Sequence, residues 1–540
     1  MKVLSIAIAS FAAVSAQTMN IRSHRRLSYE KIAGYSPGSQ VTDHCAIDLD
    51  QAAIERSLAK QTSDSFARAF EIYKQGGHSK SFAQVTLASP LKASIEKGAL
   101  ISGTNEKGEE VLGKAYETYD AGTSVIKVQY QTSDLQSNYV GCQVGALVEE
   151  DINTSGCLTE TGSVTIDGTQ YSYSYSPAED NMNGRTISGF STDAEAKMRN
   201  GCKGCPYEDF MYFYDYYGTD TYADDWVTAA FNGEKTNFKN GNADFSLISN
   251  VGKEEIISKG TAYMNIFMYV IYELEDALDD CEAGCINCNS DPVHAWDEGV
   301  CFYTGSVEGQ DAKESGYLLH ELADKRCQNF KTCGPTGSDL SGTSALNYAV
   351  FDLFALGNFQ LQSGNCQAAR DTVKHITQLM YVPMIQGTMR YAYTIGELQG
   401  GEKEKAEGAA FAAAVLPRIH AASPDAATTI YNNMKVGATS TNANDVKAAF
   451  ESVYPQLGIS CSQVGGLWNE ATNTYYHGMK PCVDTTSQQA TATNSKLGIG
   501  LGVTFGVLFI LAVGCILYMR NKEKVGKPSF GLNENKPISA

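Results

Sequence analysis

A stretch of 22 residues without a charged side chain, residues 497–518, limits what this chain can fold into more than any other feature. A helix rises about 1.5 Å per residue, so this stretch covers roughly 33 Å, enough to cross a bilayer. Four basic residues follow closely, and basic residues stay on the cytoplasmic side of a membrane. The sequence therefore predicts a single transmembrane helix over 497–518 and a cytoplasmic tail over 519–540. A cleaved lipid-anchor signal is the alternative, although such signals seldom end in a basic tail.

The first 16 residues predict a secretory signal peptide, because Lys2 precedes an apolar run that ends in the small residues Ser15 and Ala16. Both ends of the chain thus give one topology. We expect a single-pass protein of the plasma membrane whose large part, the ectodomain, is extracellular.

The cysteines suit that compartment. Of 15 cysteines, 14 lie outside the predicted membrane helix, an even number that fits disulfides formed in an oxidising environment. Spacing does not give the pairing, but it suggests local disulfides in three groups: Cys202 with Cys205, Cys327 with Cys333, and Cys281 with Cys285 and Cys288. Zinc binding by the two CxxC pairs, at 202–205 and 285–288, is the alternative.

The formal net charge of −19 argues against one class of partner. A surface this acidic repels nucleic acid and attracts cations, although much of the charge can serve solubility alone. With 43% apolar residues, the predicted ectodomain is too long for one hydrophobic core, and we expect two or three subdomains.

The spacing of apolar residues changes along the chain. Between residues 85 and 191, alternating stretches such as 124–131 and 163–175 are broken by Gly, Asn and Asp, which is typical of β-hairpins. Helical periodicity dominates residues 192–481, where Pro383 and Pro417 are expected to break or kink helices. The predicted fold class is α+β: a predominantly helical ectodomain with a β-rich insertion, a stalk and a single transmembrane helix.

This organisation divides the chain into seven segments: a signal peptide (1–16), a mobile leader (17–43), an N-terminal α/β-hairpin subdomain (44–191), a helical subdomain (192–482), a Thr/Ser stalk (483–496), the transmembrane helix (497–518) and the tail (519–540). The sequon that begins at Asn153 lies among turn residues, which predicts glycosylation of Asn153 on a surface loop.

Familiar catalytic signatures are missing, since the chain has no nucleophile elbow, zinc-protease motif, Walker loop or dinucleotide-binding glycine pattern. Oxygen ligands are instead concentrated on predicted helices of the second half. Tyr272 and Glu275 are three residues apart and share one face of an acidic helix. A solvated acidic face is the ordinary explanation of such a helix.

The segment 291–306 is more specific. If a helix begins near its start, His294, Asp297 and Glu298 stand at i, i+3 and i+4 and can face one point. Three further candidates follow on this helix and the next: Tyr303, His320 and Glu321. Taken singly, these residues are ordinary, as a helix-start or core histidine and a half-buried tyrosine.

Together these residue types suit one kind of ligand. Ferric iron is a small, hard cation that prefers anionic oxygen, so carboxylates and phenolates with an imidazole form a sensible donor set. A nearby cation also lowers the pKa of a phenol, because positive charge favours phenolate. The predicted metal ligands are His294, Asp297, Glu298, Tyr303, Tyr272, Glu275, His320 and Glu321.

Three motifs resemble the algal iron-assimilation proteins, the phytotransferrins of diatoms and related algae: Tyr73-Lys-Gln-Gly-Gly-His-Ser79, His294-Ala-Trp-Asp-Glu-Gly-Val-Cys-Phe-Tyr-Thr-Gly-Ser306 and Ala409-Ala-Phe-Ala-Ala-Ala-Val-Leu-Pro-Arg-Ile-His420. The similarity runs in order through most of residues 43–482, and the middle motif is the most specific.

The resemblance implies a protein that is induced by iron starvation and captures Fe³⁺ at the cell surface through the helical subdomain 192–482, with carbonate as a synergistic anion. It also implies endocytosis. Because acid protonates the ligands and carbonate, we expect release in acidified vesicles. The predicted partners are a surface reductase or the endocytic machinery, and no enzymatic role is predicted. Two other classes stay open. One is a receptor or adhesion ectodomain without a metal; the other is a secreted metalloenzyme, which would need an open coordination position and a substrate.

Overall fold

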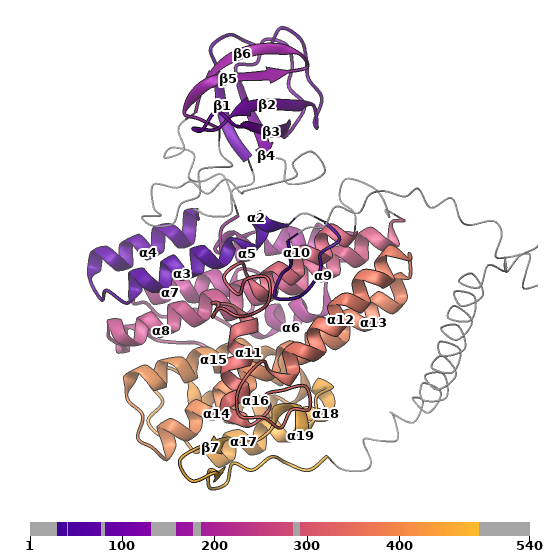
Figure 1. Cartoon of the computed structure of the whole chain (residues 1–540). Coiled ribbons are helices and arrows are strands. Elements are labelled where there is room, and N and C mark those ends of the chain that lie inside the picture. The colour runs from indigo at the N-terminus through magenta and orange to yellow at the C-terminus, as the bar shows by residue number, and fades with distance from the viewer. Residues whose placement is uncertain are drawn as a thin grey trace, which may run out of the picture. The chain divides into compact units, whose positions relative to one another are not determined.

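The computed structural model describes residues 30–39, 41–76, 82–130, 158–175, 185–284 and 292–484 (Figure 1). The buried apolar side chains of these residues form two hydrophobic cores. All helices and strands of these residues lie in the unit that ends at Cys482. One core fills a β-barrel, and the other lies among the helices.

Six antiparallel strands form the closed barrel: β1 (Phe82–Leu87), β2 (Leu100–Thr104), β3 (Glu110–Ala115), β4 (Val125–Tyr130), β5 (Thr161–Ile166) and β6 (Thr169–Ser174). Their order around the barrel is β1-β4-β3-β2-β5-β6. Successive side chains of a strand point to opposite faces, so Tyr171 and Tyr173 enter the barrel core while Gln170 and Ser172 face outward. These strands confirm the hairpin-rich segment that the alternating stretches predict.

The turn between β5 and β6 shows how local sequence fixes one hairpin. Asp167 and Gly168 have φ angles of 46° and 75°, and they connect strands whose pairing ends at Ile166 and Thr169. A two-residue hairpin loop needs positive φ at both positions, and Asp-Gly supplies it at low cost. Closure of the barrel instead depends on the long-range pairing of β1 with β4 and β6.

The helices around the second core have the following bounds: α2 (Thr42–Cys45), α3 (Ile47–Leu58), α4 (Ser63–Gln75), α5 (Gly189–Thr192), α6 (Glu208–Tyr217), α7 (Tyr222–Asn232), α8 (Asn250–Gly260), α9 (Phe267–Glu282), α10 (Pro292–Thr304), α11 (Leu319–Phe330), α12 (Ala345–Gln362), α13 (Cys366–Met380), α14 (Val382–Gly396), α15 (Glu402–Ala422), α16 (Pro424–Met434), α17 (Ala443–Glu451), α18 (Tyr454–Leu457) and α19 (Cys461–Val464). Short π or 3₁₀ turns cover Glu195–Asn200, Phe245–Leu247 and Thr261–Ile266, and β7 (Trp468–Asn469) pairs with β8 (Thr474–Tyr475). The barrel strands thus interrupt the helices between α4 and α5.

The two prolines behave differently. Pro383 stands in the first turn of α14, where a missing N–H costs little, and the chain breaks between α13 and α14 as expected. Pro417 lies inside α15, which nevertheless continues to Ala422. The carbonyl of Ala413, which Pro417 cannot bond, accepts a hydrogen bond of 2.8 Å from the hydroxyl of Tyr217. A side chain of α6 thus replaces the lost helical bond.

Close packing fixes α10, the helix of the middle motif. It packs along α9 and contacts α12 through Trp296, whose indole N–H donates to the carbonyl of Phe354 at 3.0 Å. The ring lies against Gly357, where any Cβ would collide with it. A large residue on α10 therefore fits a glycine notch on α12, and this sets the approach of the two helices.

Five disulfides join described cysteines: Cys45–Cys301, Cys202–Cys205, Cys281–Cys366, Cys327–Cys333 and Cys461–Cys482. The second and fourth confirm two of the expected local disulfides, and they leave no thiolate for zinc at the 202–205 pair. Cys281 bonds to Cys366 instead of a near neighbour, because α9 and α13 pack together. Residues 285 and 288 lie outside the described part.

The fold-class prediction requires a correction. The protein is helical with a small β-barrel, but among the described residues no helix has both the length and the apolar character needed to span a membrane, so the predicted single transmembrane helix is not supported. Residues 497–518, on which that prediction rested, lie outside the described residues.

Other predicted segments also lie outside the described residues: the signal peptide 1–16, the tail 519–540, Asn153 and almost all of the stalk 483–496. Within the predicted leader 17–43, residues 30–39 and 41–43 are described. They contact the helical body, as the bond between Tyr35 and Asp297 of α10 illustrates.

We expect the Cys45–Cys301 disulfide to contribute more stability than the short Cys327–Cys333 loop. It joins residues 256 positions apart, and a longer closed loop removes more entropy from the unfolded chain. Replacing Cys45 and Cys301 by Ala should cost roughly 5 kcal/mol of unfolding free energy, against roughly 2 kcal/mol for Cys327→Ala with Cys333→Ala. Denaturant unfolding under non-reducing conditions measures both, and equal losses would contradict the prediction.

Candidate metal centre

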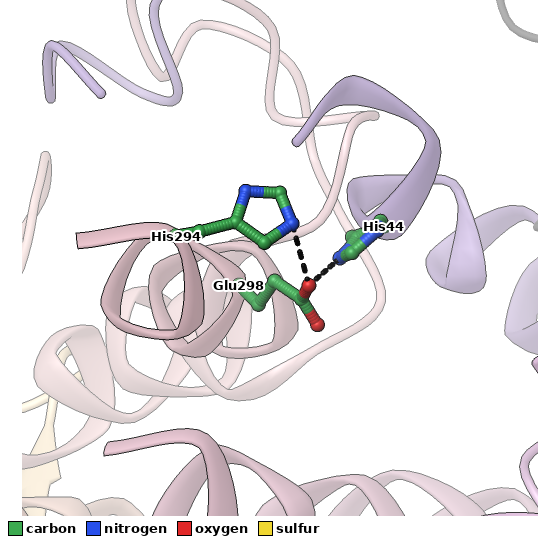
Figure 2. Close-up of side chains that lie close together, drawn as sticks. All are labelled: His44, His294 and Glu298. Carbon is green, nitrogen blue, oxygen red and sulfur yellow. Dashed lines mark ion pairs between the residues drawn. The ribbon is translucent and has the colours of Figure 1, made fainter. Parts of the chain in front are cut away.

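Two imidazoles and one carboxylate meet beside the start of α10 (Figure 2). The Oε1 atom of Glu298 lies 2.7 Å from Nδ1 of His44 and 3.0 Å from Nε2 of His294. One potential ligand atom from each of the three residues lies within 4.8 Å of the other two. No other such group of three His, Cys, Asp or Glu residues is found in the described part of the chain.

Local structure and one disulfide bring these donors together. His294 and Glu298 are four residues apart, so α10 presents them on one face. His44 belongs to the single turn of α2, and its neighbour Cys45 is bonded to Cys301, three residues beyond Glu298. The disulfide therefore holds the imidazole of His44 against the carboxylate of a helix about 250 residues away.

The cluster is largely shielded from water. The side chains of His44 and Glu298 are 7% and 12% exposed, whereas His294 is 34% exposed and forms the open side. Burial alone would raise the pKa of Glu298, but His44, His294 and Arg185 together hold that pKa well below its usual value. Glu298 is thus a carboxylate at neutral pH.

Arg185 determines the tautomer of His44. Its guanidinium contacts Nε2 of His44 and can only donate, so Nε2 accepts this hydrogen bond. Nδ1, which lies 2.7 Å from Oε1 of Glu298, then carries the proton. A metal that binds Nδ1 must displace this proton, as is general for imidazole ligands.

The adjacent face of α9 carries more oxygen donors. Glu273 is buried, and burial together with the charges of Glu298 and Asp276 raises its pKa well above the usual value. Burial and neighbouring carboxylates, including Glu273 and Glu298, raise the pKa of Tyr272 in the same way. This face therefore lies within the electric field of the cluster and would gain from a cation there.

Asp297 has a different partner set from its neighbour Glu298. Its carboxylate accepts hydrogen bonds from the Tyr35 hydroxyl at 2.6 Å and from the backbone N–H groups of Gly38 and Ser39 at 2.8 Å each. The Ser39 hydroxyl and the Asn358 amide donate as well. Burial raises its pKa to about 6 despite these bonds. Asp297 fastens the N-terminal segment to α10.

The other predicted ligands lie in separate surroundings. Tyr303 is fully buried and donates to Asn347 at 2.7 Å, and His320 faces buried Glu308 at 3.1 Å. Glu275 pairs with Arg370 at 3.3 Å, and Glu321 with Lys325 at 3.0 Å. The structure thus brings together His294 and Glu298, with Tyr272 on the neighbouring helix, and leaves the rest apart.

Sequence reasoning missed His44 and Arg185. Both precede α10 by more than 100 residues, and neither belongs to a motif of recognisable spacing. The adjacency of His44 to Cys45 becomes informative only when the partner cysteine, Cys301, is known.

The arrangement can bind a metal ion. Metal–donor distances of about 2.0–2.2 Å place neighbouring donor atoms about 3 Å apart. The two contacts of Glu298, at 2.7 and 3.0 Å, already have that spacing. Two imidazoles with one carboxylate are the donor set that holds non-haem Fe(II) in proteins and leaves coordination positions open.

Comparison with known proteins gives one match. The family described as "low iron-inducible periplasmic protein" (Fea1) matches residues 171–476, more than half of the chain. This range includes Arg185, His294 and Glu298 but begins after His44. No curated protein and no solved structure matches the chain.

We expect Glu298→Gln to lower the unfolding free energy at pH 7 by roughly 1.5–3 kcal/mol, because charge-assisted hydrogen bonds are lost in a buried place. The depressed pKa of Glu298 means that its contribution is present above the unfolded value near 4.3 and is lost as pH falls through the folded pKa. Urea unfolding at pH 7, 5 and 3.5 should therefore show a difference that shrinks only in acid.

The matched control is Glu195→Gln, which removes an exposed partner of Arg199 and should change stability by less than about 0.5 kcal/mol. A Glu298→Gln loss no larger than this control at pH 7 would argue against a tightly coupled cluster.

Proposed function

We propose that this chain, which belongs to the family of low iron-inducible periplasmic proteins, binds ferric iron outside the cytoplasm for iron acquisition, with His44, His294 and Glu298 as ligands. Family membership confirms the resemblance to the algal iron-assimilation proteins, and it gives the chain an iron-related role. The family description names induction by low iron and a periplasmic location, and it names no reaction.

The observation that carries the proposal is the convergence of three metal-binding side chains from two distant segments on one point. Their place in a family defined by low iron makes iron the reasonable cargo. The five disulfides agree with a compartment outside the cytoplasm.

Charge balance supports carbonate as the accompanying anion. Fe³⁺ brings three positive charges, and two neutral imidazoles with Glu298 supply only one negative charge. A dianionic carbonate in the open positions would complete the balance, and Arg185 offers the planar donor edge that such oxyanions prefer. If carbonate binds the guanidinium of Arg185, this guanidinium no longer donates to Nε2 of His44. The His44 proton can then move from Nδ1 to Nε2, which leaves the Nδ1 lone pair free for a metal. The anion would then prepare a ligand for the metal.

Acid would reverse this binding. Imidazoles titrate near pH 6.5, and protons compete with a metal for the same nitrogen lone pairs. Carbonate is protonated over the same fall in pH. We therefore propose that iron leaves the protein in an acidified compartment.

The direct test is equilibrium dialysis of the full-length protein against ferric citrate at pH 7.4 with bicarbonate. The wild-type protein should take up iron stoichiometrically, whereas His44→Ala, His294→Ala and Glu298→Ala should each weaken binding roughly 10-fold or more. His375→Ala removes an exposed histidine of α13 and is the control that should bind like wild type. Absence of uptake by the wild-type protein would favour a receptor or adhesion role instead.

Arg185→Gln should uncouple iron from the anion. The wild-type affinity should fall when bicarbonate is removed, while the Arg185→Gln affinity should be weak and insensitive to bicarbonate. Both dependences are measured by repeating the dialysis in carbonate-free buffer. A variant that keeps the full bicarbonate effect would exclude Arg185 as the anion-binding residue.

Lowering the pH from 7.4 to 5 should reduce the wild-type affinity at least 10-fold, since each protonated imidazole removes a ligand. Iron retention during stepwise acidification measures this loss. Undiminished binding at pH 5 would contradict release by proton competition.

A further inference from the structure

A second polar cavity, of about 300 Å³, lies among α3, α8, α11 and α15. The charged residues of its lining are Glu55, Lys259, Glu321, Lys325, Arg326 and Glu407, and Tyr263 and Tyr317 add phenols. None of these side chains belongs to the metal cluster of His44, His294 and Glu298. The cavity therefore needs an explanation of its own.

Arg326, on α11, is the unusual member of this lining. It is only 7% exposed, yet its Nε and Nη1 atoms have no hydrogen-bond partner among the described residues. None of the described carboxylates forms an ion pair with it. Its guanidinium instead lies 5.9 Å from the ring centres of Tyr391 and Phe411. Aromatic faces stabilise the cation but leave its N–H groups unsatisfied.

The other two cations of the cavity, Lys259 and Lys325, are already paired. Lys325 binds Glu321 at 3.0 Å, and Lys259 lies 3.0 Å from Glu255 and 3.7 Å from Glu407. An unsatisfied buried guanidinium is costly, and folded proteins rarely leave such donors without a partner. A charge that is buried, unpaired and beside an open cavity indicates a partner that comes from outside the chain.

We propose that this cavity binds the carboxylate group of a small organic acid, with the guanidinium of Arg326 as its cationic partner. A carboxylate accepts hydrogen bonds from guanidinium N–H groups in the same plane, which is the strongest neutralising contact available to Arg. The hydroxyl of Tyr263, also in the lining, adds a donor beside Lys259.

The glutamates of the lining select for low anion charge. Glu55, Glu321 and Glu407 all border the cavity, and any of them that is ionised repels a multivalent anion more than a monovalent one. Burial raises the pKa of each of the three, which reduces this repulsion without removing it. Phosphate and sulfate are therefore poorer ligands here than a single carboxylate.

The test is calorimetric titration of the iron-free full-length protein with acetate, lactate, phosphate and sulfate at constant ionic strength. We expect acetate or lactate to bind wild type, and Arg326→Met to weaken that binding at least 10-fold. The control is Arg390→Met. Arg390 belongs to the neighbouring helix α14 and does not line the cavity, so the carboxylate affinity of this variant should stay within about twofold of wild type.

A second measurement separates ligand loss from misfolding. Removing an unpaired buried charge should not destabilise the ligand-free protein, so Arg326→Met should melt at or above the wild-type temperature while losing the shift that carboxylate produces. Its iron uptake should also be unchanged. Three results would overturn the proposal: no carboxylate binding by wild type, equal binding of phosphate or sulfate, or equal carboxylate binding by Arg326→Met.

Discussion

The attachment of the N-terminal segment to α10 is the constraint on which the candidate site depends. Two connections flank His44: Asp297 accepts the backbone N–H groups of Gly38 and Ser39 on one side, and Cys45 is bonded to Cys301 on the other. A histidine brought from so far along the chain would otherwise lose its position to chain entropy. Fixed at both sides, it meets Glu298 at hydrogen-bond distance.

Part of the site follows from helix geometry alone. The i, i+4 spacing of His294 and Glu298 predicts that they face one point, and the structure places their atoms 3.0 Å apart. Spacing cannot decide between Asp297 and Glu298, since residues at i+3 and i+4 both neighbour His294. In the structure, the carboxylate of Asp297 accepts hydrogen bonds from the backbone N–H groups of residues 38 and 39, which need an acceptor. Glu298 is therefore the carboxylate that pairs with His294. His44 required knowledge of a disulfide that no local pattern reveals.

For the fold, as for the site, the sequence predicts what depends on neighbouring residues and misses what depends on distant ones. Alternating residues and an Asp-Gly turn predict the β5–β6 hairpin, because both are local properties of the strands. Closure of the barrel requires β1 to pair with β4 and β6, and no sequence periodicity specifies such partners. Pro417 shows the reverse case, in which a correct local rule is overridden. The rule that proline breaks a helix considers only neighbouring residues, whereas the hydroxyl of Tyr217, on another helix, donates the hydrogen bond that Pro417 cannot.

Two buried charges of this protein illustrate opposite ways of preparing for a ligand. Glu298 is compensated within the chain, so its imidazole partners are held near coordination spacing and a metal must compete with the hydrogen bonds that hold them. Arg326 has no ion-pair partner among the described residues, so a carboxylate would add contacts without breaking any that the structure records. The first arrangement lowers the affinity for the metal, because the metal must displace the contacts between Glu298 and the imidazoles. It also makes metal binding depend on pH, because those contacts change with protonation. The second costs stability while the cavity is empty and gives affinity when it is filled. A protein that must hold iron firmly and then release it would therefore use the first kind of site for the metal.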